Sequence, residues 1–199
     1  MKTILCYGDS NTWGKAATKL RLPRDRQWVN LLQAKLGQDY DVVQEGLSAR
    51  IAGSYETEKP WLNGQDPFVA IFLSAVPLDV VVIALGTNDL KTKYNQNPQG
   101  VVDNLLWYKT SIMRLAESNN GVIPHVIYVL PPNFQDGHYF PGDQNLRRDI
   151  ITEFQKQAPD EQVIIFNDLE MSEDGVHFTT GAHERVAEAI HEKVKELNI

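Results

Sequence analysis

Short runs of consecutive apolar residues alternate along the chain with longer segments in which apolar residues recur every three or four positions. The short runs span residues 3–7, 41–44, 80–85, 126–130 and 163–166, and three of them are nearly unbroken Val, Ile and Leu, as in strands buried on both faces. The longer segments have the spacing of amphipathic helices and span residues 28–36, 101–115 and 182–197. This alternation predicts an α/β fold with a mainly parallel sheet and right-handed crossovers.

The length of the chain favours one domain. It has 199 residues, of which 42% are hydrophobic, enough for one well-buried core. The pattern contains no internal repeat, low-complexity stretch or linker, so we expect a single domain over residues 1–199. The longest irregular segment, residues 131–145, is rich in proline and is a candidate wall or lid of a site.

Charge and cysteine content narrow the class of protein. The net charge of −7 disfavours nucleic acid as a partner, because binding phosphates requires clustered Lys and Arg. The one basic stretch, residues 19–26, is interrupted by apolar residues and an Asp, as in a solvated loop. The single cysteine, Cys6, excludes an internal disulfide, and no CxxC pair indicates zinc, so we expect no metal.

The apolar runs are too short for a membrane. None approaches the roughly 18 residues of a membrane span, and the few apolar residues before Gly8 are too short for a signal peptide. We therefore expect a cytoplasmic protein without a membrane partner.

Polar residues follow four of the five predicted strands. They occupy positions 8–10, 45–48, 86–89 and, a few residues after the last strand, 174–177. The carboxyl ends of parallel strands meet at one edge of a sheet, so we expect these groups to converge there. A serine hydrolase needs a nucleophile, a base, a group that orients the base and donors for an oxyanion at one such place.

Ser10 is the candidate nucleophile, and a serine needs a neighbouring base to remove its proton. His177 is the favoured base because Asp174 precedes it by three residues, a spacing that can hold a carboxylate against one ring nitrogen. Three other histidines are disfavoured as the base because they lie in a predicted strand (His125) or helix (His183 and His191). His138 lies in the irregular segment and stays open as an alternative base.

Two residues offer hydrogen-bond donors to an oxyanion. Asn88 has a side-chain NH2 group, and Gly46 has a backbone N–H without a side chain that would block close approach. Each also has an ordinary interpretation, Gly46 as a turn residue and Asn88 as a helix cap. Their joint occurrence at successive strand ends favours the catalytic interpretation.

The four groups resemble the four blocks of the SGNH, or GDSL, hydrolases, which supply Ser, Gly, Asn and His in that order. The resemblance spans nearly the whole chain and implies a flavodoxin-like three-layer α/β/α sandwich with five parallel strands. It also implies a triad of Ser10 as nucleophile, His177 as base and Asp174 as orienting carboxylate. The oxyanion hole would comprise the backbone N–H groups of Ser10 and Gly46 and the side chain of Asn88.

Two positions depart from the family pattern. Asn11 stands where the short family name has Leu, and Gln44 stands where many members have Asn two residues before Gly46. Neither departure touches an inferred catalytic atom, but both change the expected shape of the pocket.

The strings GDSNTWG, EGLSAR and LGTNDLK most resemble the bacterial arylesterase and acyltransferase branch of the family. Members of that branch hydrolyse short-chain and aryl esters, can pass the acyl group to alcohols in water, and are commonly oligomeric. The resemblance thus implies a small-molecule ester substrate, no cofactor and a homo-oligomer.

Side chains near the nucleophile are candidates for the acyl pocket, although they could equally be ordinary packing. The candidates are Asn11, Trp13, Leu47 and Phe140, with Phe134 and Tyr139 beside the last.

Two other functions compete with the esterase. A carbohydrate acetyl esterase would use the same catalytic residues. A nonenzymatic phosphate or flavin binder would use residues 8–12 as a cradle, but this run lacks both the G-x-x-x-x-G-K-[ST] and the G-x-G-x-x-G patterns. The chain also lacks a G-x-S-x-G elbow at Ser10, which argues against the α/β-hydrolase fold.

Overall fold

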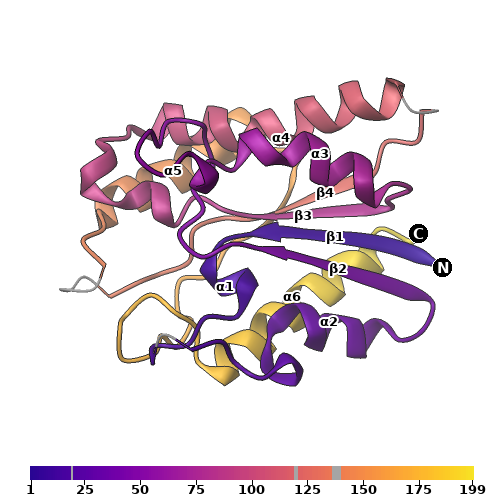
Figure 1. The fold of residues 1–199 in the computed structure, drawn as a ribbon, viewed down its shortest axis with the longest axis horizontal. Coiled ribbons are helices and arrows are strands. Elements are labelled where there is room, and N and C mark those ends of the chain that lie inside the picture. Colours follow the sequence, from indigo (N-terminus) through magenta and orange to yellow (C-terminus); the bar gives the residue numbers. More distant parts are fainter. Residues whose placement is uncertain (19, 119–120, 136–139) are drawn as a thin grey trace.

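The computed structural model describes residues 1–18, 20–118, 121–135 and 140–199, so His138 and Tyr139 lie outside the described residues. Its middle layer is a parallel sheet of five strands (Figure 1). The strands are β1 (Lys2–Gly8), β2 (Tyr40–Gly46), β3 (Val80–Ala84), β4 (His125–Val129) and β5 (Gln162–Ile164). Their order, β2-β1-β3-β4-β5, is the flavodoxin-like order. The predicted fold is confirmed.

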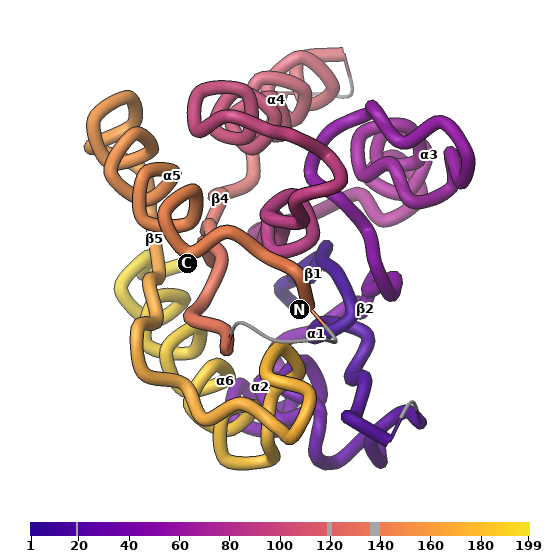
Figure 2. Tube along the Cα trace, turned by 90° about the vertical axis from the view of Figure 1, so that its left-hand side faces the viewer, coloured from indigo at the N-terminus to yellow at the C-terminus, as the bar shows by residue number. Residues whose placement is uncertain are grey.

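Helices cover both faces of the sheet (Figures 1 and 2). One face carries α3 (Gln65–Ala75), α4 (Pro98–Ser118) and α5 (Gln144–Gln157), and the other carries α2 (Trp28–Leu36) and α6 (Thr180–Glu196). A single turn, α1 (Ser10–Trp13), follows β1. The short 3-10 turns are η1 (Arg24–Arg26), η2 (Pro60–Leu62), η3 (Asn88–Leu90) and η4 (Thr92–Tyr94). None of the helices formed by the described residues is both long and apolar enough to cross a membrane.

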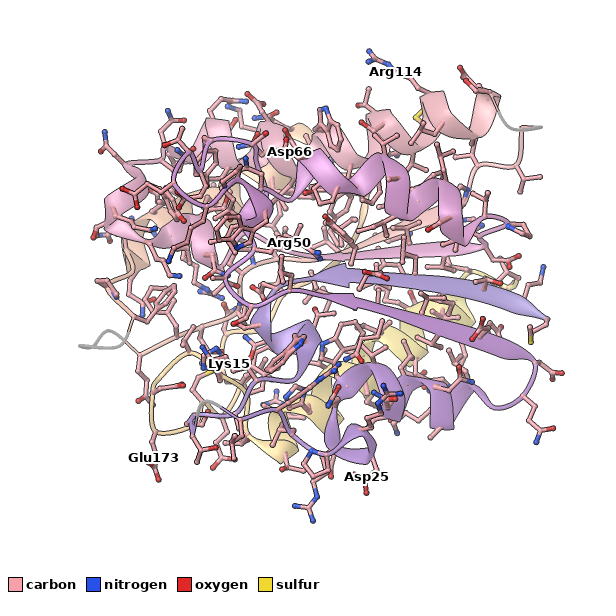
Figure 3. All side chains as sticks on the ribbon, viewed as in Figure 1. Lys15, Asp25, Arg50, Asp66, Arg114 and Glu173 are labelled. Atoms are coloured by element: carbon pink, nitrogen blue, oxygen red, sulfur yellow. The ribbon has the colours of Figure 1, made fainter. Side chains whose placement is uncertain are left out.

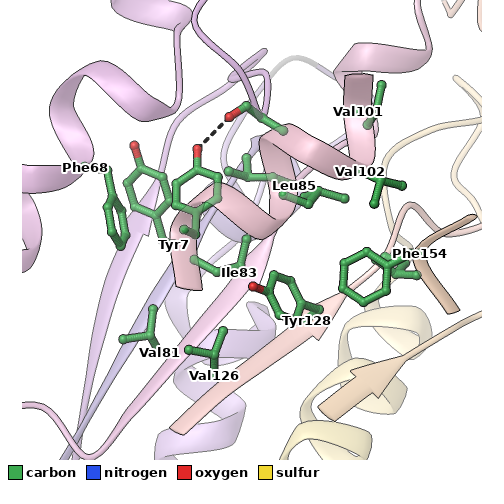
Figure 4. Packing of buried hydrophobic residues seen from close by; sticks show 14 of the residues in the cluster. Tyr7, Phe68, Val81, Ile83, Leu85, Val101, Val102, Val126, Tyr128 and Phe154 are labelled. Atoms are coloured by element: carbon green, nitrogen blue, oxygen red, sulfur yellow. Dashed lines mark hydrogen bonds between the residues drawn. The ribbon is translucent and has the colours of Figure 1, made fainter. Parts of the chain in front are cut away.

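The central strands are buried on both faces because their side chains alternate between two apolar cores. In β1, Leu5 and Tyr7 point toward α3 and α4, whereas Ile4 and Cys6 point toward α2 and α6. Figure 4 shows the first of these cores, where rings such as Phe68 pack against the sheet. This double burial explains why the strands read as unbroken apolar runs.

Side chains and glycines set the ends of the helices. Asp9, Asp143 and Thr179 cap the N-termini of α1, α5 and α6 by accepting hydrogen bonds from backbone N–H groups of the first turn. Gly37 ends α2 with a positive φ of 77°. Of the irregular segment predicted at 131–145, the last two residues open α5, whereas the described residues 131–135 and 140–143 belong to no helix or strand.

Strand order reverses direction beside β1, since β2 lies on one side of it and β3 on the other. The segments that leave these three strands meet at their carboxyl ends, which is where open α/β sheets bind ligands. The topology therefore brings Ser10, the turn after β2 and Asn88 to one place.

Gly46 permits a very close approach of α1 to β2. It pairs with Gly8 in the sheet, and a Cβ atom placed on it would lie 2.2 Å from Trp13 N and 2.6 Å from the carbonyl carbon of Thr12. Both are backbone atoms, so they cannot move aside as the end of a flexible side chain can.

We predict that Gly46→Ala lowers the free energy of unfolding by about 3 kcal/mol, because the new methyl group overpacks against backbone. Denaturant titration measures the change. Gly100→Ala in the first turn of α4 is the matched control, since its new Cβ would have its nearest neighbour at 3.4 Å. Alanine favours a helix over glycine by about 1 kcal/mol, so this control should not destabilise. Equal losses in the two variants would contradict the overpacking argument.

Candidate active site

Ser10, His177 and Asp174 lie in hydrogen-bonding contact at the carboxyl ends of the strands. Ser10 Oγ is 3.1 Å from His177 Nε2, although the two residues are 167 positions apart. His177 Nδ1 is 2.5 Å from Asp174 Oδ2. The second carboxylate oxygen, Asp174 Oδ1, accepts hydrogen bonds from the backbone N–H groups of His177 at 3.0 Å and Val176 at 3.1 Å. The tight turn therefore holds the carboxylate and the ring in a fixed relation.

The surroundings favour a neutral imidazole beside an ionised carboxylate. Burial lowers the pKa of His177, and the positive charges of Lys15 and Lys91 lower it further, whereas Asp174 opposes them. Burial acts to raise the pKa of Asp174, but hydrogen bonds from His177 and from the Val176 N–H outweigh it and leave this pKa below its usual range. A ring that donates from Nδ1 to Asp174 keeps the Nε2 lone pair for the Ser10 hydroxyl.

Ser10 begins α1, so its backbone N–H is one of the helix N-terminal groups without an intrahelical partner. Asp9 caps the same helix, with Oδ1 accepting from Asn11 N at 2.9 Å. Among the described residues, no acceptor lies within hydrogen-bond reach of the Ser10 N–H. This group is thus available to an anion next to the hydroxyl.

Asn11 joins α1 to the loop that carries His177. Its side chain donates from Nδ2 to Val176 O at 3.2 Å and accepts at Oδ1 from Phe178 N at 3.0 Å. Both bonds flank His177, and Asn11 is only 5% exposed. The side chain of this predicted pocket residue therefore links the turn that carries Ser10 to the backbone on both sides of His177.

The other candidate pocket residues divide into exposed and buried positions. Trp13 and Leu47 are partly exposed, and the guanidinium of Arg21 lies 5.0 Å from the centre of the Trp13 ring. Phe140 is buried and packs edge-on against Phe134 with ring centres 5.0 Å apart. Only the first two have surface to offer a substrate.

The backbone N–H of Gly46 does not face the site, which differs from the prediction. Successive N–H groups of a strand point to opposite sides, and that of Leu47 points to β1, where it bonds Gly8 O at 3.1 Å. The Gly46 N–H consequently points off the outer edge of the sheet, like that of Val42, which bonds Gln33 Oε1 of α2 at 2.8 Å. The absent side chain of Gly46 serves the close approach of α1 instead.

The turn after β2 crosses toward Asn88 and exposes a different N–H group. Ala49 has a positive φ of 68°, which costs about 1–2 kcal/mol for a residue with a side chain. Among the described residues its backbone N–H has no hydrogen-bond acceptor. Strain of this kind often marks a functional position. No sequence pattern indicates Ala49, because positive φ at an alanine leaves no mark in the sequence.

Arg50 anchors this turn to the sheet and was also missed. Its Nη1 donates to Gly8 O at 3.0 Å and to Glu45 O at 2.6 Å, and its guanidinium lies 4.1 Å from the centre of the Tyr7 ring. Figure 3 shows it where the ends of β1 and β2 meet the following loop, with Lys15 and Glu173 at the same end of the molecule. An arginine in a polar segment usually lies at the surface, but this one is 5% exposed.

Asn88 lies between two groups that define its orientation. Its Nδ2 donates to Arg50 O at 3.0 Å, and its Oδ1 accepts from Lys91 Nζ at 2.7 Å. One hydrogen of the amide remains for a further acceptor.

One cluster has the side-chain types of a metal site. The ligand atoms of Glu188, His191 and Glu192 lie within 4.8 Å of one another on α6, about two turns or more beyond the start of the helix. Lysines already pair with both carboxylates, Lys35 with Glu188 and Lys195 with Glu192. The cluster therefore has its charges balanced and stands apart from the triad.

Comparison with known proteins gives matches at the level of family and structure. The chain matches the model of the GDSL-like lipase/acylhydrolase family over residues 6–197. No curated protein sequence matches it.

Several solved structures are similar over almost the full length. The native aryl esterase of M. smegmatis has 28% identity and a TM-score of 0.89, covering 99% of this chain and 100% of that chain. A carbohydrate acetylesterase from Sinorhizobium meliloti has 27% identity and a TM-score of 0.88, with the same coverage. A putative arylesterase from Agrobacterium tumefaciens has 26% identity and a TM-score of 0.88, covering 98% of this chain and 99% of that chain.

Asp9 carries a pH-dependent cost to stability. Burial raises its pKa to about 6, against hydrogen bonds from Asn11 and Thr87 that lower it. Between the ordinary carboxyl pKa and about 6, the folded state binds more protons than the unfolded state, so this carboxyl makes stability fall as pH rises through that window.

We predict that Asp9→Asn gains stability relative to the wild type as pH rises from 4 to 7, by up to about 3 kcal/mol, because an amide keeps the capping oxygen and does not ionise. Denaturant titrations at several pH values measure the difference. Asp25→Asn on the exposed turn η1 is the matched control for removing a carboxylate. A difference between Asp9→Asn and wild type that stays constant with pH would contradict the assignment.

Proposed function

Because the chain belongs to the GDSL-like lipase/acylhydrolase family and is a carboxylic ester hydrolase, we propose that it hydrolyses short-chain acyl or aryl esters through a triad of Ser10, His177 and Asp174. One observation carries the proposal, the continuous contact from Ser10 Oγ to His177 Nε2 at 3.1 Å and from His177 Nδ1 to Asp174 Oδ2 at 2.5 Å. The first distance suits transfer of a proton from the serine to the imidazole, and the second suits a hydrogen bond that orients the ring.

In the proposed reaction, Ser10 Oγ attacks the ester carbonyl while its proton passes to His177 Nε2. Asp174 stabilises the resulting imidazolium through Nδ1–H. The tetrahedral intermediate collapses as His177 protonates the leaving alcohol, which departs and leaves an acyl group on Ser10. Water, activated by His177, then releases the acid. An alcohol in place of water would give acyl transfer instead.

The oxyanion in this proposal lies between three donors, which are the backbone N–H groups of Ser10 and Ala49 and the side-chain NH2 of Asn88. Ala49 takes the place that the sequence assigned to Gly46. Three observations support Ala49 as a donor. Its N–H has no partner among the described residues, its φ is strained, and the adjacent carbonyl of Arg50 accepts a hydrogen bond from Asn88. Donors fixed before the reaction stabilise developing charge without reorganising.

The proposed substrate class rests on the names of the similar solved structures. Two are named as aryl esterases or putative arylesterases, and one as a carbohydrate acetylesterase, at almost equal identity. We propose the short-chain or aryl esterase as the principal function and the carbohydrate acetyl esterase as the second candidate. A nonenzymatic phosphate binder does not agree with an ester hydrolase family.

We predict that Ser10→Ala lowers kcat for p-nitrophenyl acetate by about 10⁴-fold or more, since the covalent route is lost. A fluorophosphonate probe followed by peptide mass spectrometry should label position 10 in the wild type. Ser74→Ala, at an exposed serine on α3, is the matched control and should keep both turnover and labelling. Turnover by the folded Ser10→Ala variant would refute the triad.

We predict that aryl acetates are turned over faster than aryl esters with longer acyl chains and faster than acetylated xylose or xylan. Initial rates on p-nitrophenyl esters of increasing chain length, beside acetate release from the acetylated sugars, measure this order. Higher kcat/KM on the sugar esters would favour the second candidate. Parallel assays in aqueous ethanol detect acyl transfer as ethyl ester formed beside free acid.

We predict that replacing Ala49 by lactic acid, which converts its amide N–H into an ester oxygen, lowers kcat by about 10²-fold. Replacing Gly46 by glycolic acid is the matched control and should change kcat much less, because that N–H points off the edge of the sheet. Incorporation of the hydroxy acids by nonsense suppression keeps every side chain unchanged. A larger loss at position 46 than at position 49 would restore Gly46 as the donor.

A further inference from the structure

Lys91 directly follows η3 and reaches back into the candidate site. Its Nζ donates to Asn88 Oδ1 at 2.7 Å and lies 5.8 Å from the centre of the Phe140 ring. Its backbone forms an isolated bridge with Gly142 in the loop before α5. Lys91 is therefore fixed both by Asn88, through its side chain, and by this loop, through its backbone. Lys91 is half-buried, unlike a lysine that extends freely into water.

The contact with Lys91 decides which end of the Asn88 amide faces which neighbour. Lysine only donates hydrogen bonds, so Lys91 must meet the amide oxygen. The carbonyl of Arg50 only accepts, so it must meet the amide nitrogen, as its 3.0 Å contact with Nδ2 shows. The two contacts together keep the NH2 group, with its remaining hydrogen, directed away from Lys91. A rotated amide would lose both bonds.

The charge of Lys91 also acts on the groups around it. The charged and titratable groups that face it are Asp9, Asp89, Lys15, Lys93 and His177. Asp9 and Asp89 are buried carboxyl groups beside the nucleophile block, whereas Lys15 and Lys93 are cations that lower the pKa of Lys91. A cationic donor on the amide oxygen draws electron density from the NH2 group and strengthens it as a donor.

We propose that Lys91 is a positioning residue of the oxyanion hole, which orients and polarises the Asn88 amide so that its NH2 group meets the developing oxyanion. This proposal rests on the proposed function. Lys91 does not touch the reacting atoms, and its effect passes through Asn88.

A second consequence concerns His177. The groups that act on its ring are Asp174 and Ser10 by contact, and Lys15 and Lys91 through space. Removing the positive charge of Lys91 makes the protonated ring less unfavourable, so the pKa of His177 rises. Since the base must be neutral, the acid limb of kcat/KM should move to higher pH, by about 0.3–1 unit.

The test is a double-mutant cycle between Lys91→Met and Asn88→Ala with p-nitrophenyl acetate. Methionine matches the length of lysine and removes its charge and its donors. At pH 8, where His177 is neutral in every variant, Lys91→Met should lower kcat by about 10–100-fold with KM little changed, since removing a whole donor costs about 10²–10³-fold. In the Asn88→Ala background the same substitution should cost less than about threefold, because its route of action is gone.

Two further variants separate this role from a merely structural one. Lys93→Met is the matched control, because Lys93 is exposed and pairs with Glu56 rather than with Asn88. It should keep kcat and the acid limb of the pH profile. Lys91→Arg should return the acid limb to its wild-type position and recover part of kcat, since it restores a cationic donor. Thermal melts establish that each variant is folded.

The outcomes distinguish a failure of the proposed esterase function from a failure of the role assigned to Lys91. If Ser10→Ala or Asn88→Ala keeps wild-type turnover, the proposed function is wrong. If both lose activity but Lys91→Met keeps wild-type kcat, or its loss is undiminished in the Asn88→Ala background, the role assigned to Lys91 is wrong. An acid limb that moves equally in Lys91→Met and Lys93→Met would also overturn it.

Discussion

The contact between α1 and the end of β2 is the constraint on which the site depends. α1 begins one residue after β1, so the helix has no linker with which to avoid the neighbouring strand. α1 can lie against the end of β2 because Gly46 has no side chain. The backbone of Thr12 and Trp13 occupies the space that a Cβ atom of residue 46 would fill. A longer connection would avoid this contact, but it would also move Ser10 and its helix N-terminus away from the strand ends where Asn88 lies.

This placement explains how residues far apart in the chain form a single site. Asn11, the next residue of α1, binds the backbone on both sides of His177, so the nucleophile and the base share one rigid connection. Arg50 binds the carbonyl of Gly8 just before the nucleophile and anchors the turn that approaches Asn88. The fold therefore holds Ser10, His177 and Asn88 in place through buried hydrogen bonds to backbone.

The elements that could be predicted are those with a strong periodic or compositional mark. The buried strands read as apolar runs, and the polar residues after the strands predict that Ser10, Asp174 and His177 converge, as their contacts show. The helices α3 and α5 were missed for opposite reasons. α3 buries Phe68 and Phe72 but also exposes apolar residues, so its apolar face is not distinct. α5 is strongly polar, with only two buried apolar residues, Ile150 and Phe154.

Within the site, the sequence could indicate side chains but not the direction of backbone groups. Gly46 stood at the right strand end, yet the direction of its N–H follows from the register with β1, which is a property of the folded sheet. Asn11 looked like a pocket residue because its two backbone partners, Val176 and Phe178, are distant in sequence. Such roles depend on tertiary contacts, and no local pattern encodes them.

The charges near the triad show why net charge does not describe a site. The chain carries −7 overall, yet the positive charges of Lys15 and Lys91 act on His177, which contacts Ser10. Two carboxyl groups whose charges act on Lys91, Asp9 and Asp89, are buried and hydrogen-bonded, and burial raises both of their pKa values. Because charge interactions strengthen where water is excluded, half-buried cations beside His177 act on it more strongly than exposed carboxylates at a distance.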